Sequence, residues 1–202
     1  FEREVQQTSR LHHPNTVAIY DYGRTPEGIF YYAMEYLDGV NLEELVELDG
    51  PQPPARVIRV LAQVAHALAE AHGAGLIHRD IKPSNLILNP QGVSKVLDFG
   101  VSQALWAAGH RGGVKGTWGY MAPEQASADP QMDGRVDIYA IGILGYEMLT
   151  GHTPFPGLNP QQTLAAHVTQ TPPPVGQQRS GLSPVLEATI MRCLAKRPAD
   201  RF

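Results

Sequence analysis

This sequence has few of the features that define secreted, membrane-spanning or nucleic-acid-binding chains. It contains one cysteine, Cys193, so an internal disulfide is excluded and a reducing compartment is indicated. Its longest apolar run, residues 138–146, is too short to span a bilayer and includes two glycines. With 16 basic and 20 acidic residues, it has no positive excess that would favour nucleic acid or anionic membranes as partners.

The remaining composition is that of one soluble globular domain. The chain has 202 residues, of which 43% are hydrophobic and 18% charged, so it can bury a sizeable core. It begins at Phe1 rather than at a methionine, and no signal peptide is visible. We therefore expect a piece of a longer protein. Cys193 falls within a helical pattern, which predicts a buried structural thiol rather than a reactive one.

Two polar clusters follow short apolar runs. Residues 78–85 read His-Arg-Asp-Ile-Lys-Pro-Ser-Asn, and they lie between the apolar runs 76–77 and 86–88. We expect these runs to be short buried strands that hold a polar loop at a cleft. The second cluster, Asp-Phe-Gly at residues 98–100, follows another apolar run.

In this order, the two clusters match the catalytic loop and the metal-binding loop of protein kinases, H-R-D-x-x-x-x-N and D-F-G. The chain therefore resembles the larger part of a eukaryotic-type serine/threonine protein kinase domain, in the compact style of the bacterial branch. The resemblance implies a mixed α+β, two-lobed fold. Residues 1–37 would form part of the small lobe, with a helix, strands and hinge, and residues 38–202 the large catalytic lobe.

Local patterns predict the main elements. Residues 17–22 and 29–35 should be strands joined by the turn at residues 25–28. Asn41 followed by Glu44 predicts a capped helix start. The apolar spacing over residues 54–72 predicts a long amphipathic helix. Three further helices are expected: one over residues 1–11, one over residues 137–150 that Gly151 closes, and a last one that starts at Ser183.

The catalytic loop carries side chains suited to phosphoryl transfer. The resemblance implies that Asp80 accepts the proton of a substrate hydroxyl and that Lys82 reaches the transferring phosphate as a point charge. Asn85 and Asp98 would supply oxygen ligands to Mg²⁺.

The same resemblance assigns a nucleotide site. The backbone groups of Glu35 and Leu37 would receive the adenine, Met34 would guard the rear of the pocket, and Leu88 would contact the nucleotide. Glu4 would pair with an ATP-binding lysine; by itself, Glu4 reads as a solvated helix residue.

A further set of residues would support the site. Arg79 would pair with a negative group on the activation loop, and Asp137 would hold the backbone of the catalytic loop. Glu124 and Arg201 would form a buried ion pair that anchors the activation segment. His78, Phe99 and Gly100 complete this supporting set.

The activation segment favours a protein substrate. Residues 116–124 end in Ala-Pro-Glu and resemble a peptide-docking element, which argues against a small-molecule kinase. Thr117 and the Lys-Pro-x-Asn form of the catalytic loop resemble serine/threonine rather than tyrosine kinases, and the resemblance implies that Thr117 belongs to the catalytic set by contacting Asp80. Residues 103–116 contain no Ser, Thr or Tyr, so we expect constitutive activity or control from outside this irregular loop.

Two family motifs have no counterpart in this sequence. It contains neither the glycine-rich phosphate loop nor the strand lysine of V-A-I-K. We therefore expect this piece alone to be inactive, and a pseudokinase or docking module stays open as the alternative. The resemblance implies ATP and Mg²⁺ as cofactors, proteins bearing Ser or Thr as partners, and no nucleic acid or membrane contact. A cytoplasmic location is expected, either as a free protein or as the cytosolic domain of a membrane-anchored receptor-like kinase.

Overall fold

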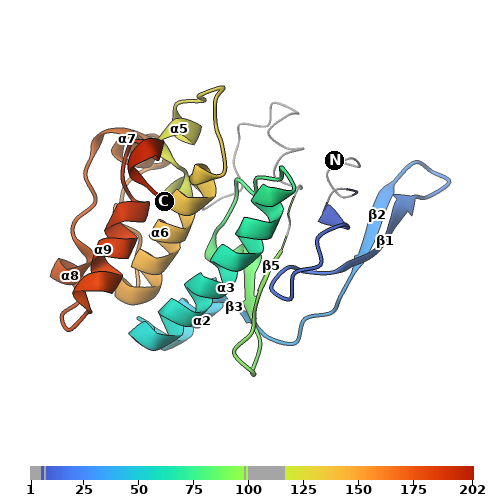
Figure 1. The fold of residues 1–202 in the computed structure, drawn as a ribbon, viewed down its shortest axis with the longest axis horizontal. Coiled ribbons are helices and arrows are strands. Elements are labelled where there is room, and N and C mark those ends of the chain that lie inside the picture. The colour runs from blue at the N-terminus through green and yellow to red at the C-terminus, as the bar shows by residue number, and fades with distance from the viewer. Residues whose placement is uncertain (1–5, 7, 98, 100–116) are drawn as a thin grey trace.

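The first sheet is a hairpin at one end of the molecule (Figure 1). The structure is a computed structural model that describes residues 6, 8–97, 99 and 117–202. Strands β1 (Ile19–Arg24) and β2 (Phe30–Met34) pair antiparallel, with Tyr22 opposite Tyr32. Gly28 has a φ of 83°, in the left-handed region that glycine adopts without strain, and it closes the turn. Both strands and the turn between them are as predicted, with ends that differ by one or two residues.

The second sheet lies against the helices and has the order β3 (Val40–Asn41), β4 (Leu86–Leu88), β5 (Ser94–Val96), all antiparallel. Residues 76–77 form no strand, so that prediction was wrong. The chain turns sharply at Gly75, where φ is 76°, and the backbone N–H of Leu76 donates to the carbonyl oxygen of Ala71. Leu76 is buried through this helix-end turn instead of through a strand ladder.

Helices α2 (Leu42–Asp49) and α3 (Pro54–Gly73) form where the sequence predicts them. The capping box is confirmed, because the Asn41 side chain accepts a hydrogen bond from the Glu44 N–H and the Glu44 side chain accepts one from the Asn41 N–H. Helix α3 buries one face, made of residues three or four apart (Val57, Val60, Val64, Ala67, Leu68 and Ala71). This apolar face rests on α6.

Helix α6 (Arg135–Thr150) is the centre of the core. Residues 136–149 are buried except for Ile138 and Glu147, which are half-buried. A Cβ at Gly142 would lie 2.7 Å from the Cβ of Cys193, so glycine lets α9 (Pro184–Cys193) pack closely on α6. Gly151, with φ of 85°, ends the helix as predicted.

Short elements complete the helical part. They are η1 (Pro83–Asn85), η2 (Thr117–Tyr120), α5 (Pro123–Ala126), α7 (Pro160–Thr169), α8 (Val175–Gln178) and η3 (Pro198–Asp200). Ser183 caps α9 as predicted, since its hydroxyl accepts from the Leu186 N–H. Helices α7, α8 and α9 lie at the end of the molecule opposite the hairpin (Figure 1).

The mixed α+β fold is confirmed: a hairpin and a small sheet precede and flank a mostly helical body. The boundary at residue 37 stays a prediction. The loop predicted at 102–115 lies outside the described residues, as do residues 1–5 and 7 of the helix predicted at 1–11; residues 6 and 8 are helical and residues 9–10 form a turn. Of the described helices, none combines the length and hydropathy needed to cross a bilayer.

The buried His167 of α7 should make the stability of the fold sensitive to acid. The Tyr139 hydroxyl lies 2.9 Å from its Nδ1, Phe155 packs edge-on against the ring, and Lys196 Nζ donates to its carbonyl oxygen. Burial, and then the charge of Lys196, lower the pKa of His167 to about 4. Between about pH 6.5 and pH 4, His167 is protonated in the unfolded chain but stays neutral in the folded chain. Stability from this group is therefore complete above about pH 6.5 and is lost as pH falls toward 4, about 3 kcal/mol in all.

Urea unfolding measured between pH 7 and 4.5 checks this. The difference in unfolding free energy between the wild type and His167→Gln should shrink as pH falls. The exposed His66 on α3 offers the matched control, because His66→Gln should follow the wild-type pH dependence. A pH-independent difference for His167→Gln contradicts the assignment.

Candidate active site

Three of the predicted catalytic side chains meet in one polar cluster. Lys82 Nζ lies 2.8 Å from Asp80 Oδ2. Asn85 donates through Nδ2 to the Asp80 carbonyl oxygen at 2.9 Å and to Asp80 Oδ2 at 3.1 Å. The side chains of Lys82 and Asp80 are 12% and 18% exposed, so the cluster is largely buried but still in contact with solvent. The carboxylate is held between a cation and an amide.

The chain adopts this geometry because apolar residues alternate with polar ones. Ile81 and Leu86 are buried on either side of the cluster. Pro83 fixes its own φ and starts η1, and the Asn85 N–H donates to the Lys82 carbonyl oxygen. The buried residues act as anchors, and the Asp80 and Lys82 side chains stay partly exposed.

Asp137, at the start of α6, holds the loop from below. Its Oδ2 accepts from the His78 N–H at 2.9 Å, and its Oδ1 accepts from the Arg79 N–H at 2.8 Å. Its Oδ2 is also 2.8 Å from His72 Nε2 at the end of α3. Arg79 has a φ of 66°, which is uncommon for a residue with a side chain. The two hydrogen bonds to Asp137 hold the backbone in this conformation.

His78 connects the loop to the segment at Leu97 and Phe99. Its Nε2 lies 2.7 Å from the Leu97 carbonyl oxygen, and its ring packs edge-on against Phe99 at 4.7 Å between centroids. The Phe99 carbonyl oxygen accepts from the Thr8 hydroxyl at 2.8 Å. Arg79 has a buried Nε without a hydrogen-bond partner among the described residues.

The predicted hinge lies where β2 ends. Met34 is 44% exposed, while Glu35 and Leu37 are half-buried. The Glu35 N–H donates to the Ala18 carbonyl oxygen at 2.9 Å, which ties this segment to the start of the hairpin.

Leu88 lies away from the hinge. Side chains alternate along β4, and residues directly opposite in an antiparallel pair share a face. Ile87 is opposite Lys95, whose ammonium group reaches Glu35 of the predicted hinge, whereas Leu88 is opposite Ser94, which is fully buried. The structure thus places Ile87 on the hinge face.

Leu88 instead lines an open groove of about 540 Å³ with α2 and α3. The sequence reasoning did not select Ile87. Strand alternation counted from a buried Leu86 is the signal that could have found it.

Glu124 and Arg201 form a buried pair at the far side of α6. Arg201 Nη1 and Nη2 donate to the two Glu124 carboxylate oxygens at 2.6 and 2.9 Å. The same guanidinium donates to three carbonyl oxygens, those of Arg135, Ala195 and Lys196. The side chains of Arg201 and Glu124 are 0% and 7% exposed, so the pair is shielded from water. All five N–H groups of the Arg201 guanidinium are used in these hydrogen bonds.

Some predicted site residues cannot be placed. Glu4, Asp98, Gly100 and the side chain of Thr117 lie outside the described residues. The described part of the site still contains a carboxylate that can accept a proton, a lysine at hydrogen-bond distance from it, and an amide oxygen donor for a hard cation.

His72 and Lys95 are two further residues that sequence reasoning did not select. Each acts on a predicted site residue that is 60 or more positions away in the chain, Asp137 or Glu35. No local pattern marks such contacts.

Comparison with known proteins gives a consistent result. Residues 1–202 match the family described as "Protein kinase domain". The chain is 40% identical over 216 residues to "Serine/threonine-protein kinase pkn3" of Myxococcus xanthus, covering 100% of the chain and 39% of that protein. It is 41% identical over 209 residues to "Serine/threonine-protein kinase PknB" of Mycobacterium tuberculosis, covering 100% of the chain and 33% of that protein. The chain therefore spans well under half the length of these curated relatives.

Proposed function

This chain belongs to the protein kinase domain family, among serine/threonine kinase relatives, and from that membership we propose that it transfers the γ-phosphate of ATP to Ser or Thr hydroxyls of protein substrates. The observation that supports this most directly is the contact of Asp80 with Lys82 and Asn85. Phosphoryl transfer needs positioning and charge neutralisation more than covalent chemistry, and these are the groups that provide both.

Asp80 is the proposed base. Lys82 at 2.8 Å orients its carboxylate, so that it can accept a hydrogen bond from the substrate hydroxyl and take the proton late in the reaction. When the phosphate is bound, Lys82 turns from Asp80 to the transferring group as a point charge.

Asn85 and Asp98 are the proposed Mg²⁺ ligands. Asn85 donates through Nδ2 to Asp80, which leaves its Oδ1 as the atom that faces a hard cation. The fit is supported by the donor set, since amide and carboxylate oxygens are what Mg²⁺ prefers. Bound Mg²⁺ supplies neutralisation of phosphate charge.

The proposed adenine site lies between the hinge and β4. Backbone groups of Glu35 and Leu37 would receive the base edge, and Met34 would close the rear. We place Ile87 rather than Leu88 at the apolar floor, because Ile87 shares the face of β4–β5 that Lys95 extends toward Glu35.

Transfer of labelled γ-phosphate to a generic Ser/Thr protein substrate tests the proposal, using the complete natural protein that carries this chain. Label should appear on phosphoserine or phosphothreonine, and chelation of Mg²⁺ should abolish it. Label on a small alcohol instead, or no label from a folded protein that binds ATP, would contradict the proposal. The second result would favour a docking module.

A further inference from the structure

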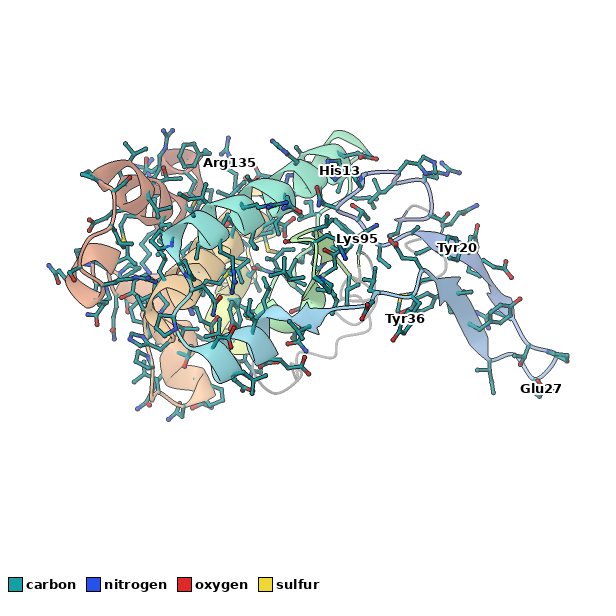
Figure 2. All side chains as sticks on the ribbon, turned by 90° about the horizontal axis from the view of Figure 1, so that it is seen from below. His13, Tyr20, Glu27, Tyr36, Lys95 and Arg135 are labelled. Carbon is teal, nitrogen blue, oxygen red and sulfur yellow. The ribbon has the colours of Figure 1, made fainter. Side chains whose placement is uncertain are left out.

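Lys95 joins three segments that are distant in the sequence. It lies on β5, directly opposite Ile87 on β4. Its Nζ donates to Glu35 Oε1 at 2.6 Å and to the Thr16 carbonyl oxygen at 3.2 Å. Figure 2 shows Lys95 where the hairpin meets the rest of the molecule, near the chain that continues to Tyr36.

Glu35 in turn forms hydrogen bonds with Ala18, just before the hairpin. The same Oε1 accepts from the Ala18 N–H at 2.8 Å, and the Glu35 N–H donates back to the Ala18 carbonyl oxygen at 2.9 Å. The backbone of Glu35 is thus fixed by one hydrogen bond of its own and by two that its side chain accepts. All three act on the residue whose backbone is proposed to receive the adenine.

The pair differs from an ordinary surface ion pair. Both side chains are 19% exposed and the atoms are 2.6 Å apart. The Arg56–Asp49 pair at the edge of α2 and α3 is 4.0 Å apart, with side chains 45% and 61% exposed. Exposed pairs of that kind contribute little, whereas a short, charge-assisted hydrogen bond shielded from water constrains geometry.

We propose that Lys95 is a positioning residue for nucleotide binding: through Glu35 it fixes the hinge backbone above the Ile87 face of the small sheet. The inference rests on the proposed function for the identity of the nucleotide. Because Lys95 approaches the hinge and not the Asp80 cluster, it should affect the binding of ATP more than the transfer step.

Steady-state kinetics and adenosine binding by calorimetry, on the complete natural protein, separate these effects. Lys95→Met keeps the apolar stem but removes the charge, and it should raise KM for ATP and Kd for adenosine about ten-fold, with kcat changed less than about three-fold. Lys95→Arg keeps the positive charge and should restore both constants to within about three-fold of the wild type, because a guanidinium can donate to both the Glu35 carboxylate and the Thr16 carbonyl oxygen. Arg56→Met, which breaks the exposed pair, should change neither.

A double-mutant cycle tests the proposed partner. Glu35→Gln removes the charge but keeps an acceptor for the Ala18 N–H, and its effect combined with Lys95→Met should be far less than the product of the two single effects.

Several results would overturn the inference. One is a double mutant whose effect equals the product of the effects of Lys95→Met and Glu35→Gln. Another is a KM change for Lys95→Met no larger than that for Arg56→Met. A third is a Lys95→Met protein that loses kcat and Tm without a change in KM. Failure of the wild type to bind adenosine would overturn it as well. If the wild type binds adenosine but transfers no phosphate, the proposed function fails, and the Kd values still decide the role of Lys95.

Discussion

Asp80→Asn is expected to lower the rate of phosphotransfer at least about 100-fold while leaving ATP affinity nearly unchanged, since a positioned base contributes about 10²–10⁴-fold. The substitution keeps the size and hydrogen-bonding shape of the side chain, so Lys82 and Asn85 retain a partner at Oδ1 of the new residue. What is lost is the negative charge that can accept the substrate proton. Transfer of labelled phosphate at saturating ATP, with nucleotide binding measured in parallel, checks both halves of the expectation.

Asp49→Asn is the matched control. Asp49 carries the same chemical change in an exposed pair at 4.0 Å from Arg56, outside the proposed site. Its transfer rate should equal that of the wild type. An Asp80→Asn protein that keeps more than about a tenth of the wild-type rate would remove Asp80 from the role of base.

Arg201→Ala is expected to destabilise the domain by about 3–5 kcal/mol, because it leaves the Glu124 carboxylate buried without its cation. Three carbonyl oxygens lose a donor at the same time. For a domain of this size, the loss corresponds to a fall in Tm of about 10 °C. Scanning calorimetry or thermal unfolding followed by circular dichroism measures it directly.

Two variants make this result specific. Glu27→Ala removes a charge from the exposed hairpin turn and should leave the melting temperature unchanged. Arg201→Lys keeps the positive charge but offers three donors without the planar fork, so it should recover only part of the stability. Equal melting temperatures for Arg201→Ala and Glu27→Ala would show that the buried pair does not anchor this part of the fold.

The sequence predicted best those features whose cause is local. Asn41 and Glu44 cap α2 reciprocally because their spacing allows it in any helix. Helix α3 extends as predicted because a single apolar stripe repeats over five turns, and glycine after it ends the periodicity. The contact of Asp80 with Lys82 and Asn85 was also predictable, since the three residues lie within a span of five positions.

Features set by tertiary contacts were not predictable from such patterns. Residues 76–77 have the apolar character of a strand, yet Asp137 binds the N–H groups just beyond them, and no strand among the described residues pairs with them. Leu88 and Ile87 have similar hydrophobicity, so composition could not say which faces the hinge. That choice depends on the pairing of β4 with β5. The contacts of His72 and Lys95 join segments that no spacing rule connects.

The position of Asp137 has a consequence for the entropy of catalysis. Its carboxylate fixes the catalytic-loop backbone from the first turn of the most deeply buried helix. The loop can therefore become disordered only if the hydrogen bonds to α6 break, and it does not fluctuate as a free surface segment would. The conformational entropy of Asp80 is lost when the chain folds and not when a substrate arrives, so substrate binding energy would not be consumed in ordering this proposed base. We therefore expect regulation of the domain to act through segments other than this loop.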